Sequence, residues 1–454
     1  MGEGRSSGAG PTRRRLLLAL LALLLGVAAW WGPSLREAAA LATIRAAIAD
    51  HDWSRAETLL REGAAAGGLV AAQREFLLGR VFRRQRRFAE AERCFDAAQA
   101  LGWSEEEITR QRMLARAQSG DVGSVKERIG GMLAGGADDA FAEDCYEALA
   151  EGFIGSFRMD DARECLEFWS RWQPGNPLPS FWMGVIEDRF ERPVFALEQY
   201  TRALAMNPRD HEVRIRVARL ELDTARLDDA QRHFRECLAE RPDDPRAVLG
   251  LADCLLRAGD QATARDLYHD ALTTDLTAEQ AAAALTELGQ MALEGGEVGR
   301  GAMLLEQAVH VDPRGTRARL TLAGALLRLG DEEGAKRERE SAQRLAERQR
   351  RLATITHEAL GKPNDPGFRA EAGAILLEAG FEQEGLKWLE TALRIDPGHG
   401  LSHRVLADHY AALGDAPRAA HHRELAGDAP PPGPAGPAAA DGARPSAGGG
   451  AVAP

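Results

Sequence analysis

The sequence predicts an all-α solenoid built from stacked helix–turn–helix hairpins, and two observations carry this prediction. First, a pattern of small, aromatic and proline positions in residues 180–242 returns after 34 residues. Second, the composition is rich in alanine and glycine but only 6% aromatic, as close helix packing requires. Because a single hairpin cannot bury its apolar face alone, the repeated units must stack on one another.

Three copies of the pattern begin at Gly184, Ala218 and Ala252, each 34 residues after the last. Small residues let the two helices of a hairpin approach closely, and the aromatic position fills the space between hairpins. A proline after the second helix stops it, because proline lacks the amide donor and clashes with the preceding turn. The residues assigned to these packing positions along the chain are Gly79, Ala91, Phe95, Ala150, Ala162, Gly184, Ala196, Tyr200, Pro208, Ala218, Ala230, Phe234, Pro242, Ala252, Ala264, Tyr268, Gly289, Pro313, Ala323, Ala335, Gly373, Pro397, Ala407 and Ala419.

This spacing resembles the tetratricopeptide repeat, a helix–turn–helix unit of the same length, and about ten units are expected. The resemblance implies a protein-binding scaffold in which the first helix of each hairpin lines a concave groove. Arginines at equivalent groove positions would grip the carboxylates of an acidic peptide through forked hydrogen bonds. The alternative is an ordinary solvated face of an arginine-rich protein. The candidate groove residues are Arg80, Arg84, Arg189, Arg219, Arg257 and Arg328.

An apolar run begins at Leu16 and ends at Gly32, directly after three arginines. Its length and its flanking charge predict one transmembrane signal anchor, with residues 1–15 as a basic cytoplasmic N-terminus. The repeats would then lie outside the cytoplasmic (inner) membrane. Cleavage of a signal peptide at 27–29, which would release a soluble exported protein, is the alternative. A twin-arginine export signal is a weaker one.

The remaining boundaries follow from changes in phase and composition. The main array is expected over 34–342, an extended charged helix and junction over 343–365, and a C-terminal pair of repeats over 366–426. The charged helix carries an imperfect heptad pattern, so self-association through it is a further hypothesis. Residues 427–454 are mostly proline, alanine and glycine, which cannot bury a core, so a disordered tail is expected.

The sequence offers no constellation for catalysis and no cofactor site, so we do not expect an enzyme. His399 and His403 have a spacing that would allow a shared metal, but no convincing third ligand accompanies them. Glycine clusters such as Gly130-Gly131 are expected at helix ends. Cys145 and Cys165 are expected to be buried thiols, with a disulfide between them as the alternative in an exported chain.

A net charge of −12 argues against nucleic acid as the partner. We therefore expect a membrane-tethered bacterial scaffold for protein–protein interactions, in the assembly of an envelope or secretion complex. The alternative is an accessory subunit that positions an enzyme of polysaccharide synthesis or export. Paired aromatic residues on the groove would favour this alternative, and Phe76 and Phe181 are the candidates.

Overall fold

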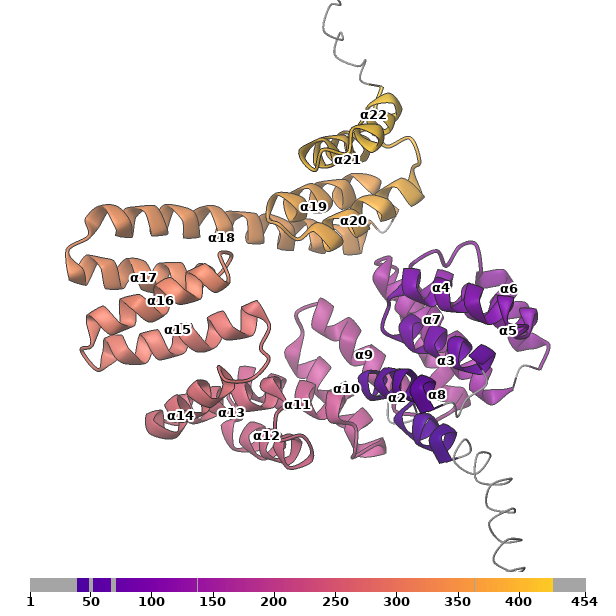
Figure 1. The fold of residues 1–454 in the computed structure, drawn as a ribbon, viewed down its shortest axis with the longest axis horizontal. Helices are drawn as coiled ribbons and strands as arrows, with labels where there is room; N and C mark the ends of the chain where they lie inside the picture. Colours follow the sequence, from indigo (N-terminus) through magenta and orange to yellow (C-terminus); the bar gives the residue numbers. More distant parts are fainter. Residues whose placement is uncertain (1–38, 49–51, 67–70, 137, 363, 428–454) are drawn as a thin grey trace, which may run out of the picture. The chain divides into compact units, whose positions relative to one another are not determined.

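The structure is a computed structural model that describes residues 39–48, 52–66, 71–136, 138–362 and 364–427. All secondary structure within these ranges is helical (Figure 1). The chain divides into two compact units, with the division between Glu347 and Arg348. The predicted membrane span at 16–32 and the predicted tail after 427 lie outside the described residues. No helix in the described ranges is long and apolar enough to cross a bilayer.

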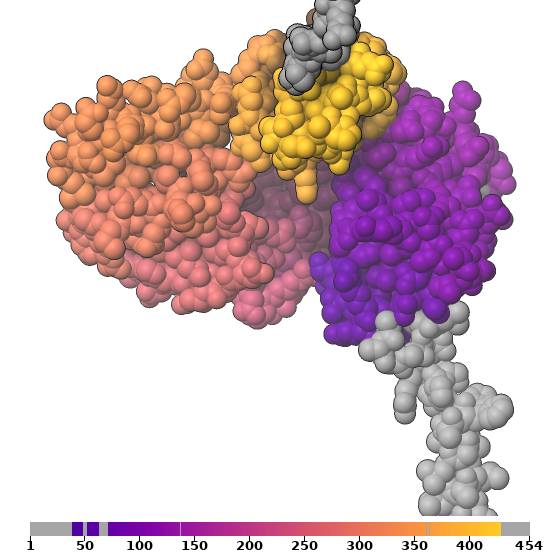
Figure 2. Space-filling model, turned by 45° about the horizontal axis from the view of Figure 1, so that its top comes forward, coloured from indigo at the N-terminus to yellow at the C-terminus, as the bar shows by residue number. Residues whose placement is uncertain are grey.

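Unit 1 is a succession of antiparallel hairpins, each with a first and a second helix. In the space-filling view the colour changes gradually along this unit, as expected when consecutive hairpins lie side by side (Figure 2). The first helices are residues 39–48, α3 (Ala71–Arg84), α5 (Glu105–Gln118), α7 (Asp139–Gly155), α9 (Leu178–Arg189), α11 (His211–Asp223), α13 (Pro245–Arg257), α15 (Ala278–Glu294) and α17 (Thr316–Leu329). The second helices are α2 (Trp53–Ala66), α4 (Phe88–Ala100), α6 (Lys126–Ala134), α8 (Met159–Trp172), α10 (Pro193–Met206), α12 (Leu227–Glu240), α14 (Gln261–Ala271), α16 (Val298–Val311) and α18 (Glu332–Gly361).

The helix α18 has 30 residues and crosses the division between the units. Unit 2 continues with two more hairpins of the same kind. Their helices are α19 (Pro366–Glu378), α20 (Glu382–Ile395), α21 (Gly400–Ala412) and α22 (Ala416–Leu425).

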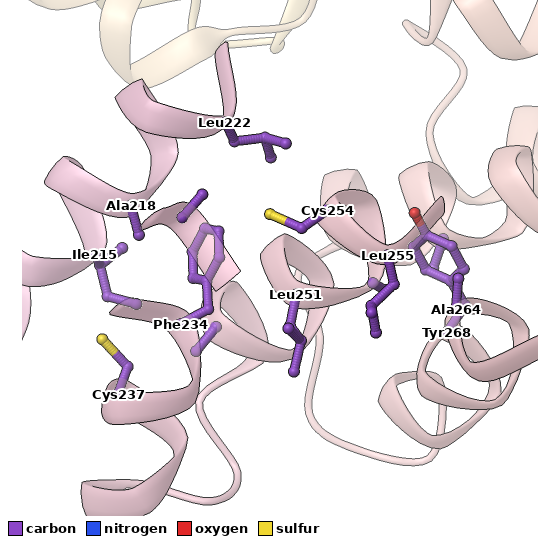
Figure 3. Packing of buried hydrophobic residues seen from close by; sticks show 14 of the residues in the cluster. Ile215, Ala218, Leu222, Phe234, Cys237, Leu251, Cys254, Leu255, Ala264 and Tyr268 are labelled. Carbon is purple, nitrogen blue, oxygen red and sulfur yellow. The ribbon is translucent and has the colours of Figure 1, made fainter. Parts of the chain in front are cut away.

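The core between the α11–α12 and α13–α14 hairpins includes a close contact between an aromatic ring and a glycine. Phe234 of α12 is 1% exposed and lies among side chains of α11 and α13 (Figure 3). A Cβ atom on Gly250 of α13 would lie 2.2 Å from Cζ of Phe234. Since packed interiors leave no room for such an overlap, the ring of one hairpin requires the glycine of the next. The same reasoning applies within a hairpin to Gly184, where a Cβ would lie 2.6 Å from Tyr200.

The turn between the two helices of a hairpin uses a left-handed residue at one fixed position. This residue is a glycine in several hairpins, for example Gly259 with φ +92° and Gly330 with φ +85°. The equivalent residue of the α11–α12 hairpin is Ala225, with φ +60°. A Cβ in this region costs about 1–2 kcal/mol. Arg86, Phe157 and Glu191 are also non-glycine residues with positive φ at this position.

We therefore expect Ala225→Gly to stabilise the α11–α12 hairpin by about 0.5–1 kcal/mol, after the entropic cost of glycine in the unfolded chain is subtracted. Hydrogen exchange of the α11 and α12 amides would measure this as a slower opening. The same substitution at Ala292, inside α15, is the control and should destabilise by about 1 kcal/mol. Faster exchange in Ala225→Gly would show that the turn is not strained.

The structure places the glycine pair at 130–131 and all five cysteines. Gly130 and Gly131 lie inside α6, so the prediction that they end a helix is wrong. The five cysteines are free thiols, and burial raises the pKa of Cys145 and Cys165 to about 12. Cys145 therefore acts as a small apolar group in the α7–α8 hairpin, whereas the half-buried Cys165 thiol donates to the carbonyl of Tyr146 at 3.6 Å.

Candidate functional site

Two of the six candidate groove arginines, Arg80 and Arg84, belong to an internal ion-pair network. The Arg84 guanidinium pairs with the carboxylates of Asp144 and Glu147, and Arg80 Nη2 lies 3.6 Å from Asp144 Oδ2. Within the chain, α7 thus supplies carboxylates to both arginines, and their role as ligands of a partner's carboxylates stays a prediction.

Arg83 is the centre of this network and is fully buried. Its Nε donates to Gln111 Oε1 at 2.9 Å and its Nη1 to Gln118 Oε1 at 2.7 Å. Its Nη2 lies 3.5 Å from Asp144 Oδ2. Arg83 thus joins three consecutive first helices, α3, α5 and α7.

A second branch of the network lies beside the first. Gln118 Nε2 donates to Glu151 Oε1 at 2.9 Å, and Arg86 Nη1 donates to Glu151 Oε2 at 3.0 Å. Arginines and carboxylates are therefore paired with one another in this region, although Arg83 Nη2 has no hydrogen-bond partner among the described residues. We call this set the α3–α7 network; its members are Arg80, Arg83, Arg84, Arg86, Gln111, Gln118, Asp144, Glu147 and Glu151.

The pKa values within the network show that both partners stay charged at neutral pH. Burial lowers the pKa of Arg83 to about 10, although Asp144 opposes this shift, so the guanidinium remains protonated. For Asp144, burial alone would raise the pKa, but Arg84, Arg83 and Arg80 together lower it. A carboxylate with a lowered pKa stabilises the fold above its unfolded pKa, and this stabilisation is lost on acidification.

Three other candidate arginines share a single structural contact. Nη1 of Arg189, Arg257 and Arg328 donates to the main-chain carbonyl of the residue 35 positions earlier. The acceptors are the carbonyls of Ile154, Leu222 and Leu293, at 3.3, 3.0 and 3.4 Å. Each arginine thus donates to a carbonyl near the end of the preceding first helix, and this carbonyl also accepts a main-chain N–H of the turn that follows.

These anchored arginines stay exposed and keep further N–H donors for a partner. The sixth candidate, Arg219, differs from them: its side chain is 65% exposed and lies 3.7 Å from Asp223 on the same helix. The structure thus leaves Arg189, Arg219, Arg257 and Arg328 accessible.

The first helices from α11 to α17 pack consecutively, and side chains link them across their exposed side. Glu212 on α11 accepts from Arg246 Nη1 on α13 at 2.6 Å. Glu287 on α15 accepts from Arg317 Nη2 on α17 at 3.0 Å. We call the exposed side of the first helices from α9 to α17 the first-helix surface; its members are Arg189, Arg216, Arg219, Asp223, Arg246, Asp253, Arg257, Glu287, Glu294, Arg317, Leu320, Leu327 and Arg328.

Two acids of the first-helix surface are held in partly buried positions. Asp253 accepts a hydrogen bond from the hydroxyl of Tyr268, the aromatic packing residue of its hairpin. Burial raises the pKa of Asp253 and of Glu287, despite the nearby arginines. A cationic group of a partner beside these two carboxylates would offset part of the free-energy cost of their burial. The reason is that an opposite charge favours the ionised form.

The first-helix surface also has an apolar part on α17. Leu320 is 49% exposed and Leu327 is 40% exposed. Gly324 lies between them in sequence, and a Cβ built there would meet no atom within 4 Å. Residues at i, i+4 and i+7 share one helical face, so these three positions form an uncovered apolar stripe.

The aromatic pair that would favour a carbohydrate ligand is not available for stacking. Phe76 is 6% exposed, and its ring is stacked on Trp103 with 5.0 Å between centroids. The guanidinium of Arg216 lies 5.4 Å from the centroid of Phe181. Both rings are therefore occupied by contacts within the chain, which corrects the suggestion that they form a carbohydrate platform.

Sequence reasoning missed the acidic half of the α3–α7 network. Asp144, Glu147 and Glu151 follow one another at i, i+3 and i+7, which places them on one face of α7. Because α7 is a first helix, this face lies on the same side as the arginines of α3. The i, i+3, i+7 spacing of these acids is the sequence feature that could have predicted the network.

A histidine pair lies in unit 2, between α21 and α22. Nδ1 of His403 is 3.0 Å from Nδ1 of His422, and Nε2 of His403 is 2.9 Å from the carbonyl oxygen of Pro397. Since a carbonyl only accepts, Nε2 of His403 carries the hydrogen and its Nδ1 accepts from Nδ1–H of His422. His399 caps α21 instead of joining the pair, and no group of three metal-ligating side chains occurs within the described ranges.

We expect the α21–α22 hairpin to loosen as the pH falls below about 6.5. Burial, followed by the charges of His403 and His421, lowers the pKa of His422. The unfolded hairpin therefore takes up this proton more readily, so the stabilisation is present above pH 6.5 and declines below it. Hydrogen exchange of the α22 amides, compared at about pH 7.5 and about pH 5 after correction for intrinsic rates, measures the effect.

His422→Gln is the informative variant, because its amide can still donate to His403 but does not titrate. We expect the pH response of α22 to be reduced in this variant and retained in His310→Gln, an exposed histidine of α16. An equal response in His422→Gln and in the unchanged chain would contradict the assignment.

Comparison with known proteins agrees with the repeat geometry. A family model described as tetratricopeptide repeat matches residues 215–284 and 286–335. No curated protein matches the chain.

Several solved structures are similar at low identity. A type IV pilus biogenesis factor, PilW, is 17% identical, with 44% of this chain and 91% of that chain covered and a TM-score of 0.39. The human IFIT1 dimer with PPP-AAAA is also 17% identical, with coverages of 79% and 90% and a TM-score of 0.39. YrrB, a TPR protein with an unusual peptide-binding site, is 18% identical, with coverages of 45% and 96% and a TM-score of 0.28. Residues 215–284 and 286–335 of this chain thus match the tetratricopeptide repeat in sequence, and the structure folds them as helical hairpins.

Proposed function

We propose that the protein is a non-catalytic scaffold that holds a segment of a partner protein on the first-helix surface of α9 to α17. The observation that carries this proposal is the uncovered apolar stripe of Leu320, Gly324 and Leu327, flanked by the exposed Arg317 and Arg328. An apolar centre with a polar rim is the usual composition of a protein-binding surface.

The contrast with the N-terminal hairpins supports this location. There the first helices α3, α5 and α7 are joined by the α3–α7 network, whose charges are paired within the chain. A partner would have to break buried ion pairs to bind there, which costs several kcal/mol. On α13 and α17, by contrast, Arg257 and Arg328 are exposed and already oriented by a main-chain carbonyl, so binding orders fewer side chains.

Photo-crosslinking tests the scaffold proposal. A photoreactive amino acid at Leu320 or Leu327 is expected to give discrete adducts with a partner in the native cell. The same probe at Met303 is the matched control, because this residue is 62% exposed but lies on the second helix α16. Adducts that are equal at Met303 and Leu327, or absent at Leu320 and Leu327, would contradict the proposal.

We further propose that the run from Leu16 to Gly32 tethers the scaffold to the cytoplasmic membrane of a bacterium, with the repeats outside, where they serve the assembly of an envelope or secretion complex. The support is the sequence alone: three arginines precede the apolar run. A topology reporter fused after Gly427, together with the mass of the mature N-terminus, tests this. An external C-terminus on an uncleaved chain is expected; an internal reporter contradicts the orientation, and cleavage near Ala29 contradicts the tether.

A further inference from the structure

Five charged residues with alternating sign occupy one equivalent position on the first-helix surface. Each lies in the last turn of its helix, on α9, α11, α13, α15 and α17 in order. Their spacing in sequence is 34, 34, 37 and 34 residues, so they mark successive hairpins. We call them the charge row; its members are Arg189, Asp223, Arg257, Glu294 and Arg328.

All five members of the charge row are exposed, and none forms an ion pair with another member. The three arginines are anchored through Nη1 to main-chain carbonyls. Asp223 lies 3.7 Å from Arg219, and Glu294 accepts from Gln290 Nε2 at 2.9 Å. Contacts within the chain thus orient the row; Asp223 is also ion-paired with Arg219, but both side chains are exposed, and an exposed pair of this kind is weak.

The alternating sign of the charges along the row determines which partner segments are attracted to it. A uniformly acidic segment would be attracted by the arginines but repelled by Asp223 and Glu294. A uniformly basic one would be repelled by Arg189, Arg257 and Arg328. A segment whose own charges alternate is attracted at every position, and like charges that face each other are excluded by their cost.

The spacing of the helices decides the spacing of charges in the partner. The first helices α11, α13, α15 and α17 pack on one another in turn, and packed helices lie about 8–10 Å apart. An extended chain advances about 3.3 Å per residue. One helix is therefore crossed by about three residues of an extended segment.

We propose that the charge row selects an extended protein segment in which acidic and basic residues alternate every third position, beginning and ending with an acid. This inference rests on the proposed function and names the partner class of the same surface. The expected partner is thus a charge-alternating segment and not the uniformly acidic peptide that the sequence alone suggests. The pattern is the same in both directions, so the row does not set the direction of the bound segment.

Synthetic peptides test the proposal with the full chain. One peptide carries three acids and two bases in alternation, each separated by two neutral residues. The other has the same composition with the acids and bases in separate blocks. We expect the alternating peptide to bind at least about tenfold more tightly in fluorescence anisotropy at low salt, with a smaller difference at high salt because exposed charges are screened.

Swapping the central charges should remove this preference. The variant Asp223→Arg, Arg257→Glu, Glu294→Arg is expected to bind the alternating peptide at least about tenfold less tightly. The control variant Asp270→Arg, Arg235→Glu, Glu306→Arg makes the same charge changes at exposed positions of the second helices and should leave the preference intact.

Equal binding of the two peptides, binding of neither, or an equal loss in the control variant would overturn the role of the charge row. The scaffold proposal is judged separately, by the crosslinks at Leu320 and Leu327. Adducts at these positions without a charge-order preference would leave the scaffold standing and remove only the inference about its partner.

Discussion

Replacing Arg83 with methionine is expected to destabilise the hairpins of α3 to α7 by about 3–5 kcal/mol. The substitution keeps much of the side-chain volume but leaves the Asp144 carboxylate without its fully buried partner. It also removes the donors to Gln111 and Gln118, and a buried acceptor without a donor costs about 1–3 kcal/mol.

Hydrogen exchange of α3, α5 and α7 measures this loss locally, which suits a repeat array whose units need not unfold together. Arg80→Met is the matched control: its side chain is 35% exposed and lies 3.6 Å from Asp144, so a loss of less than about 1 kcal/mol is expected. Similar losses of unfolding free energy in the two variants would show that the burial of Arg83 does not determine its contribution to stability.

Gly152→Ala is expected to cost about 1–3 kcal/mol or to shift α7 away from α5. A Cβ atom on Gly152 would lie 2.1 Å from the main-chain oxygen of Ala117 and 2.6 Å from Cγ2 of Val122. Main-chain atoms cannot rotate aside as a flexible side chain can, so the helices must separate.

The control for this prediction is Gly324→Ala, in which the added methyl meets no atom within 4 Å. There the higher helix propensity of alanine should stabilise α17 by about 0.5–1 kcal/mol. The shift in thermal unfolding midpoint compares the two variants. An unchanged unfolding midpoint in Gly152→Ala would show that α5 and α7 adapt to the extra methyl group.

The repeat itself could be predicted from the sequence because its physical causes are local. Small residues at a fixed interval and an aromatic residue four positions later are needed wherever two helices of a hairpin cross, so they recur with the period. The hairpin over α11 and α12 shows this directly, with Ala218, Ala230 and Phe234 buried where the pattern places them. Gly130 and Gly131 were misjudged because glycine usually marks a helix end, whereas α6 continues through both.

The candidate site was only partly predictable for a different reason. Sequence phase assigned Arg84 and Arg257 to the same helix position, and at that level the two are equivalent. Their partners come from other hairpins: Asp144 lies 60 residues from Arg84, and the Leu222 carbonyl 35 residues from Arg257. The sequence by itself determined which residues repeat and therefore which face each arginine occupies. Only the tertiary structure decided whether that arginine is engaged in an ion pair or left exposed. The carbonyl contact of Arg257 recurs with the repeat at Arg189 and Arg328, whereas the acids that pair with Arg84 lie 60 and 63 residues away, at a separation that the repeat period does not give.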